Sequence, residues 1–302
     1  MRSARLPGRV ESSTRPSGSD AETWGGPRAI SFDFGNTLCP VSDEALRTVL
    51  LDSAERIAAR SGPFALEDFV DAWRAEARRQ FAVNGPLGRE NDLAERLVRV
   101  FARLRGMEPP PAPDGATDPA APGGATPAAV WDDEAAATLS RRDEVEAGVR
   151  DYGEAFVARM PVDERAGPLL ARLHGQYRLA ILSNWPLAWA IDAIAERAGW
   201  TPYLDVVVVS ERVGWVKPHP AIFAATTAAL GVSPGELLHV GDDWAADIVG
   251  AKRAGARAAY LVARPAASPL PSSVPDGSVT PDIVLRDLVE IEDHLPGLAD
   301  RD

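Results

Sequence analysis

Short apolar runs recur along the chain, and most of them end in polar or charged residues. They lie at residues 29–32, 177–182, 205–209, 237–240, 257–262 and 282–285. From the second run onward, most neighbouring runs are separated by a segment with apolar residues at every third or fourth position, which is the spacing of a helix. Strands that alternate with helices of this length predict a parallel sheet with helices on both faces. We therefore predict an α/β fold built on a doubly wound parallel sheet.

Between the first two runs the pattern is helical only. Apolar residues recur with helical spacing over residues 43–60, 66–81 and 93–104, and the pattern returns from Ala128 to about Met160. Residues 41–160 are thus predicted to form an all-helical module inserted into the α/β core.

Two further stretches carry no periodic pattern. Residues 1–28 are rich in Arg, Ser, Gly and Pro, without the apolar stretch of a secretory signal, and we expect a disordered leader. Residues 108–127 are rich in Pro, Ala and Gly, which is typical of a flexible surface insertion. We assign residues 29–40 and 161–290 to the core and residues 291–302 to a tail.

Charge and composition narrow the class of protein. The formal net charge is −12 over 302 residues, which argues against a general binder of nucleic acid or of anionic membranes. No apolar run approaches the roughly 18 residues of a membrane span. Cys39 is the single cysteine, so no intramolecular disulfide can form, and we expect a cytoplasmic protein.

Polar side chains of different chemistry follow the predicted strands. They are Asp33, then Ser183 and Asn184, then Lys217, and finally Asp242, Asp243 and Asp247. Because ligands bind at the carboxyl ends of strands in such sheets, we expect these groups to form one site. Carboxylates with phosphate oxygens are the ligands of Mg²⁺, and lysine and hydroxyl groups suit phosphoryl oxygens. A carboxylate can also act as a covalent nucleophile. The set therefore predicts Mg²⁺-assisted phosphoryl transfer on a small phosphorylated molecule.

Four segments in this order resemble the motifs of the haloacid dehalogenase superfamily. They read DFGNTL, LAILSN, VGWVKPHPAIF and LLHVGDDWAADIVGAKRAG. The resemblance covers residues 29–40 and roughly 162–290. The helical insertion directly after the first segment is similar to the helical cap of the first subclass of that superfamily. The resemblance thus implies a Rossmann-like core, a hydrolase activity and Mg²⁺ as cofactor.

The resemblance also implies roles around the metal. Asp33 would be the nucleophile and a Mg²⁺ ligand, together with the Gly35 backbone carbonyl and the Asp242 carboxylate. Thr37 would brace the turn or contact the phosphoryl group. Asp247 would orient Lys217 or a metal-bound water.

Further roles concern the substrate. Ser183 would donate a hydrogen bond to a phosphoryl oxygen, with the Asn184 backbone beside it, and Lys217 would neutralise the transferring group. Asp243 would stand near the metal or cap the following helix, where Asp is favoured. Trp185, like Trp215 and Trp244, either walls the substrate pocket or packs on its own helix or against the cap.

Position 35 departs from the phosphatases of this superfamily. They carry a second Asp there, which acts as general acid and base, and loss of such a group typically costs ~10²–10⁴ in rate. Two alternatives to a phosphomonoester phosphatase therefore stay open. One is a metal-independent dehalogenase, since dehalogenases of the superfamily also lack the second Asp. The other is a catalytically weak protein that binds a phosphorylated ligand.

Overall fold

The computed structural model describes residues 26–110, 131–262, 270 and 273–296. Most of the predicted leader and of the 108–127 stretch therefore lies outside the described residues. Arg28, which we had included in the leader, extends the sheet. Its N–H donates to the carbonyl of Glu236 at 2.9 Å, and its carbonyl accepts from Arg178 at 3.0 Å.

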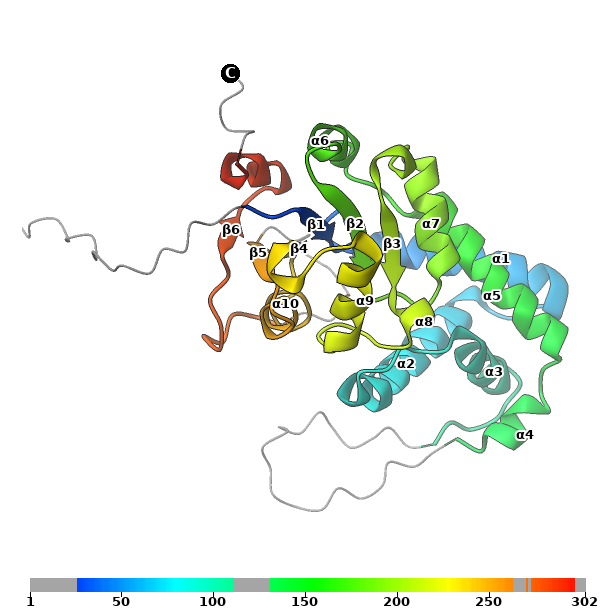
Figure 1. Cartoon of the computed structure of the whole chain (residues 1–302). Coiled ribbons are helices and arrows are strands. Elements are labelled where there is room, and N and C mark those ends of the chain that lie inside the picture. Colours follow the sequence, from blue (N-terminus) through cyan, green and yellow to red (C-terminus); the bar gives the residue numbers. More distant parts are fainter. Residues whose placement is uncertain (1–25, 111–130, 263–269, 271–272, 297–302) are drawn as a thin grey trace, which may run out of the picture.

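The core is one sheet of six parallel strands in the order β3-β2-β1-β4-β5-β6 (Figure 1). The strands are β1 (Ala29–Phe32), β2 (Arg178–Ser183), β3 (Val206–Val209), β4 (Leu237–Gly241), β5 (Arg257–Leu261) and β6 (Ile283–Leu285). From β1 the strand order runs through β2 to β3 at one edge of the sheet, and from β4 it runs through β5 to β6 at the other edge. β1 and β4 are therefore neighbours, and their carboxyl ends lie beside each other. The predicted parallel α/β fold is confirmed.

Alternate residues of the strands face two separate apolar cores, because successive side chains of a strand point to opposite faces. On β2, Leu179 and Ile181 belong to one core and Ala180 and Leu182 to the other. The first face is covered by α6 (Ala166–Leu173), α7 (Ala188–Arg197) and η5 (Leu288–His294). The second is covered by α9 (Pro220–Leu230), η4 (Trp244–Val249) and α10 (Gly250–Arg253).

Short helices complete this part of the fold, and they are η2 (Thr201–Tyr203), α8 (Ser210–Val213) and η3 (Pro234–Glu236). After β4 the chain forms a π-helical turn that is followed directly by a short α-helix. The core also continues past residue 290, our predicted limit. Ile291 and Leu295 are buried because the apolar side of η5 packs beside α6.

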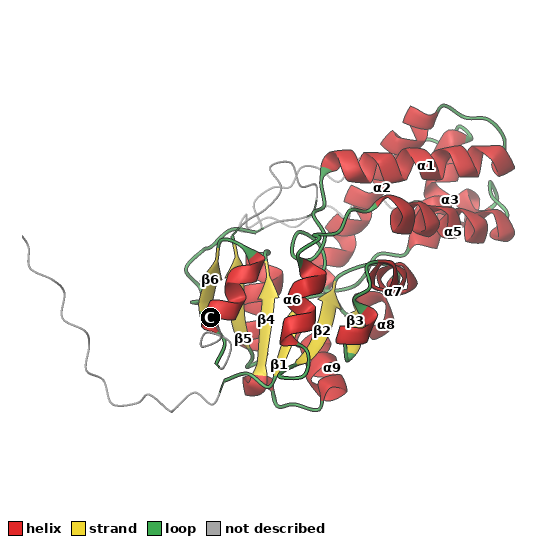
Figure 2. Cartoon of the chain, turned by 90° about the horizontal axis from the view of Figure 1, so that it is seen from above, coloured by secondary structure: helices red, strands yellow, loops and turns green. Residues whose placement is uncertain are grey.

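The inserted segment is helical, and Figure 2 shows it grouped beyond one end of the sheet. It comprises α1 (Asp43–Ser61), α2 (Leu66–Asn84), η1 (Gly85–Leu87), α3 (Leu93–Leu104), α4 (Asp133–Ala137) and α5 (Arg142–Arg159). Ser42 and Asp92 cap α1 and α3 by accepting hydrogen bonds from N–H groups of the first turn. Buried Ile57, Leu97 and Tyr152 hold the helices together.

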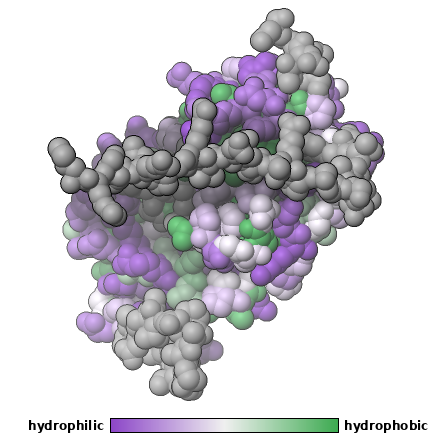
Figure 3. Space-filling view, turned by 90° about the vertical axis from the view of Figure 1, so that its left-hand side faces the viewer, coloured by the Kyte–Doolittle hydropathy of each residue, from purple (hydrophilic) through white to green (hydrophobic). Residues whose placement is uncertain are grey.

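Among the described residues, no helix combines the length and apolar character that a membrane span needs. The face of the molecule in Figure 3 is largely hydrophilic, with its hydrophobic residues in small separate spots.

Candidate active site

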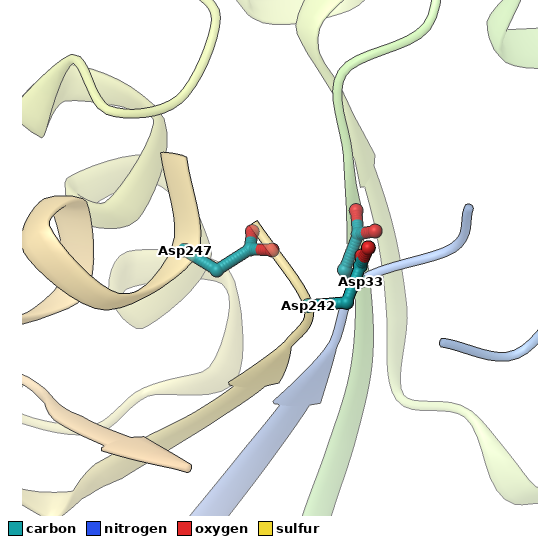
Figure 4. A group of neighbouring side chains, drawn as sticks. All are labelled: Asp33, Asp242 and Asp247. Carbon is teal, nitrogen blue, oxygen red and sulfur yellow. The ribbon is translucent and has the colours of Figure 1, made fainter. Parts of the chain in front are cut away.

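Three carboxylates converge where β1 and β4 end. Asp33 follows β1, Asp242 follows β4, and Asp247 belongs to η4. One oxygen of each lies within 4.8 Å of the others, and Figure 4 shows the three side chains turned toward one another. The Asp33 N–H donates to the Val240 carbonyl at 2.8 Å, which ties the two strand ends together. Parallel pairing of neighbouring strands thus creates the cluster.

Lys217 joins this cluster from the loop before α9, and its side chain is buried. Its Nζ donates to Asp33 Oδ1 at 2.6 Å, to Asp247 Oδ1 at 2.7 Å and to the Leu182 carbonyl at 2.9 Å. An ammonium group has three protons to donate, so all three are used. Lys217 therefore holds the Asp33 carboxylate in place. Asp33 Oδ2 accepts no hydrogen bond from the described residues, which leaves it available to a substrate or a metal.

The charges in the cluster do not balance. Burial raises the pKa of Asp33 to about 8, with Asp247 and Asp242 adding to the rise and Lys217 opposing it. Burial acts to raise the pKa of Asp247 as well, but Lys217 and His239 outweigh it and lower that pKa. Burial would lower the pKa of Lys217, yet the two carboxylates raise it. Three carboxylates facing one ammonium group make a site that suits a divalent cation.

His239 belongs to the same network, although its sequence position predicts only a structural histidine. Its Nε2 lies 3.1 Å from Asp247 Oδ1 and its Nδ1 lies 2.8 Å from Ser31 Oγ. The Asp243 N–H donates to Asp247 Oδ2 at 2.9 Å. Because its oxygens already accept from Lys217, His239 and this N–H, Asp247 is better placed to orient Lys217 than to bind a metal. The sequence did hold a signal for this position. Because side chains alternate between the two faces of β4, His239 lies on the face that α9 and η4 cover.

The Asn184 side chain has a structural role in addition to the backbone role that the resemblance implied. Its side-chain amide brackets the Lys217 backbone, accepting from the Lys217 N–H at 2.7 Å and donating to its carbonyl at 3.0 Å. Ser183, at the end of β2, is buried, and its hydroxyl forms no hydrogen bond with the described residues. The Thr37 hydroxyl is likewise buried without a partner in the described structure. Both hydroxyl groups are therefore unoccupied donors.

The turn after Asp33 depends on Asn36 and Gly35. Asn36 adopts the left-handed conformation at φ 57°, and its side chain lies 3.4 Å from Asp242 Oδ2. Gly35 is outside that region of φ, so its backbone does not require glycine. A Cβ atom at position 35 would, however, lie 2.7 Å from Leu270 Cδ1. An apolar side chain thus occupies the space beside Gly35.

Asp243 caps η4 as the sequence suggested, because its Oδ1 accepts from the Ala246 N–H at 2.7 Å. The three tryptophans divide between the two roles we considered. Trp185 lines the cleft described below and stacks on Phe156 with ring centroids 4.5 Å apart. Trp215 stacks on His219, and the buried Trp244, the first residue of η4, packs edge-on against Tyr260 of β5, so neither of them is among the residues that line the cleft.

A cleft of about 970 Å³ connects these groups with the helical insertion. Its floor includes Asp33, Gly35, Ser183, Lys217 and Asp242 at the strand ends. Residues of α1, α2, η1, α3 and α5 form the opposite wall. The site therefore lies between the α/β core and the insertion, at a size that accommodates a small metabolite.

Comparison with curated proteins identifies relatives among hydrolases. The chain is 33% identical over 122 residues to bovine haloacid dehalogenase-like hydrolase domain-containing protein 3, covering 40% of this chain and 42% of that protein. It is 32% identical over 114 residues to N-acylneuraminate-9-phosphatase of Rattus norvegicus (38% and 46%). It is 33% identical over 116 residues to phosphoserine phosphatase of Thermus thermophilus (37% and 46%). The matches span less than half the length of each of these relatives.

Solved structures share the fold over most of the chain. A 2-haloacid dehalogenase from Pseudomonas syringae aligns with a TM-score of 0.59 at 18% identity, covering 88% of this chain and 96% of that one. A HAD-hydrolase from Bacillus subtilis bound to magnesium aligns with a TM-score of 0.56 at 17% identity (90% and 99%). The family model of the haloacid dehalogenase-like hydrolases matches residues 27–255. Because that match spans most of the core and the insertion, this chain belongs to the haloacid dehalogenase-like hydrolases.

Proposed function

We propose that the protein is a Mg²⁺-dependent phosphatase that hydrolyses a small phosphomonoester through Asp33. The observation that carries the proposal is the group of Asp33, Asp242 and Asp247, whose carboxylate oxygens lie within 4.8 Å of one another beside one buried Lys217. A dehalogenase that works without metal has no need of this surplus of buried negative charge. Relatives named as phosphatases support the same reaction class.

Asp33, Asp242 and the Gly35 backbone carbonyl would hold the metal. When bound, Mg²⁺ would supply positive charge that neutralises the phosphate oxygens. Asp33 Oδ2, the oxygen that Lys217 leaves free, would attack phosphorus while the bond to the leaving oxygen breaks, forming an aspartyl-phosphate. Water would then attack the phosphorus, releasing phosphate and restoring the Asp33 carboxylate. The free hydroxyl groups of Ser183 and Thr37 would donate to phosphoryl oxygens.

The helical insertion would act as a cap that encloses the substrate. We propose residues 41–160 for this cap and residues 29–40 and 161–290, extended by η5, for the core. The contacts that join the two parts in the described structure include two hydrogen bonds from core residues to the segment between α2 and α3. The Val216 N–H donates to the Gly88 carbonyl at 3.0 Å, and Ser210 Oγ donates to Glu90 Oε2. We place the protein in the cytoplasm.

A second candidate is a metal-independent dehalogenase, which the apolar contact of Leu270 beside Gly35 favours. A carbon–halogen bond needs no proton on its leaving group, so an apolar wall at that point suits it. A third is a weakly active protein that binds a phosphorylated ligand, since the usual acid is missing.

One experiment separates the three. The purified protein is incubated with a panel of phosphorylated metabolites and with 2-haloacids, each with Mg²⁺ and with excess chelator. A phosphatase releases phosphate only with Mg²⁺, and Asp33→Asn abolishes the release. Halide release in chelator would replace our proposal with the dehalogenase. Labelling of Asp33 in a single turnover, without further turnover, would support the weakly active protein.

A further inference from the structure

The wall of the cleft that faces the strand ends carries four arginine side chains. Arg74 and Arg78 belong to α2, Arg89 follows η1, and Arg96 belongs to α3. None of the four forms an ion pair with a described residue, whereas most other arginines in the described ranges do. This concentration of unbalanced positive charge contrasts with a formal net charge of −12 for the whole chain.

The four arginines are not equivalent. Arg96 is buried, its guanidinium lies 5.1 Å from the centroid of the Trp73 ring, and its Nε donates to Gln80 Oε1 at 2.8 Å. It therefore forms part of the wall itself. Arg78 and Arg89 are exposed to the cleft, and their side chains make no hydrogen bond to a residue that the structure describes. Their guanidinium groups are free to reach a bound molecule.

The spacing of Arg74 and Arg78 on α2 disfavours a purely structural role for these two arginines. Arg74 and Arg78 are four residues apart, and like charges at this spacing repel each other on a helix. The neighbouring Arg79 instead pairs with Glu76, its Nε lying 3.5 Å from Glu76 Oε2. The helix thus provides an ion-paired carboxylate for Arg79, whereas Arg78 has none and Arg74 has only the more distant charge of Glu67, which pairs with Arg47. An anionic ligand would remove the repulsion.

The carboxylates on the same wall form no ion pair with Arg78 or Arg89 in the described structure. Glu90 accepts from the Asn91 N–H at 2.7 Å and from the Ser210 hydroxyl, and it forms no ion pair with Arg89. Asp43 is exposed at the start of α1 and makes no ion pair with any arginine in the described part of the chain. Arg78 and Arg89 therefore face the cleft without an ion-paired carboxylate among the described residues.

We propose that Arg74, Arg78 and Arg89 bind a second anionic group on the substrate. This inference rests on the proposed function, which places the reacting phosphate at Asp33. The substrate class is then a small phosphomonoester that carries a carboxylate or a second phosphate on the part facing the helical insertion. Planar guanidinium groups suit both, because each presents paired oxygens to two N–H donors.

The test compares matched substrates that differ in one anionic group. With Mg²⁺, kcat/KM is measured for 3-phosphoglycerate against glycerol 3-phosphate, and for fructose 1,6-bisphosphate against fructose 1-phosphate. We expect the extra anion to raise kcat/KM by about tenfold or more, the size of a hydrogen-bonded contact between charged groups. The first pair reports on a carboxylate and the second on a phosphate.

The preference is expressed as the ratio of kcat/KM for the compound with two anionic groups to kcat/KM for its partner with one. The variant Arg78→Gln/Arg89→Gln should lower this ratio by about tenfold or more, chiefly through KM. The control is Arg150→Gln, which removes an exposed arginine of α5 that also lacks an ion pair among the described residues. It should leave the ratio unchanged. The ratio of the unmodified protein should also fall as salt is added, because exposed charges are screened.

The proposal is overturned if neither pair shows a preference for the second anion, or if the double variant keeps it. If no phosphomonoester is hydrolysed at all, the proposed function fails separately. Calorimetric binding of the same compounds to Asp33→Asn then decides, because it requires no turnover. Equal affinity for both members of each pair would refute the arginine site, and tighter binding of the compound with two anions would support it.

Discussion

Leu270 Cδ1 lies 2.7 Å from the point where a Cβ atom at Gly35 would stand. Position 35 is the place at which phosphatases of this superfamily carry their second Asp. The chain therefore lacks the carboxyl group and also fills its neighbourhood with an apolar side chain. A proton donor introduced at position 35 would therefore also require a smaller side chain at position 270.

The first prediction follows from this contact. Gly35→Asp alone should gain little, because Leu270 obstructs and desolvates the new carboxyl group. Gly35→Asp/Leu270→Ala should hydrolyse phosphomonoesters with poor leaving groups faster, within the ~10²–10⁴ expected of acid–base help. Steady-state kinetics on one poor and one activated leaving group measures the gain.

Leu270→Ala by itself serves as the control and should not show that gain. Asp33→Asn added to the double variant should remove it, since no nucleophile would remain. A double variant that folds, binds Mg²⁺ and gains nothing would mean that another group donates the proton.

The second prediction concerns the metal. Asp242→Ala should weaken Mg²⁺ binding by at least about tenfold, because it removes a charged ligand from a buried site. Isothermal titration calorimetry on the purified protein gives the affinity. Asp293→Ala, which removes an exposed carboxylate on η5, should leave the affinity unchanged. Unaltered Mg²⁺ binding in Asp242→Ala would place the metal elsewhere.

The third prediction concerns pH and stability without metal. The pKa of Asp33 is raised from its ordinary 3.8 to about 8 in the folded protein. The folded state therefore takes up a proton that the unfolded state releases, and stability falls as the pH rises through this range. The lowered pKa of Asp247 has the opposite sign, but its effect appears only when the pH falls toward that carboxyl's ordinary value.

Thermal melts of the metal-free protein between about pH 7 and 9 test this directly, because burial lowers the pKa of His239 from 6.5 and would oppose the trend at lower pH. The melting temperature of the unmodified chain should fall with rising pH, and Mg²⁺ should restore it. Asp33→Asn, which stays neutral, should melt higher at pH 8 and depend less on pH. An equal pH dependence in both proteins would show that Asp33 is not the titrating group.

The fourth prediction concerns Asn184. Because its amide bonds both the N–H and the carbonyl of Lys217, Asn184→Ala should let that loop shift and Lys217 move away from Asp33. We expect kcat to fall about ten- to hundredfold, as misplacement of a catalytic group does. Ser233→Ala is the control, since it removes a capping contact with Glu236 far along the chain. Kinetics of Asn184→Ala equal to those of the control would contradict a positioning role.

The sequence by itself determined the fold class and the main chemistry. Buried strands alternate with helices over the core, and that alternation is a local property of apolar spacing, so the parallel sheet could be predicted. Asp33 and Asp242 follow two such strands directly. Their meeting required only that neighbouring parallel strands end at the same edge.

Tertiary structure alone decided the parts that depend on long-range contacts. His239 joins Asp247, Asn184 holds Lys217, and Leu270 approaches Gly35 from 235 positions further along the chain. No local pattern encodes these distances. The same holds for Arg78 on α2 and Arg89 in the loop after η1, which the sequence indicates only as polar positions. Their unpaired charge becomes evident when the folded chain sets them across a cleft from Asp33, because only packing determines which carboxylates lie within reach of them.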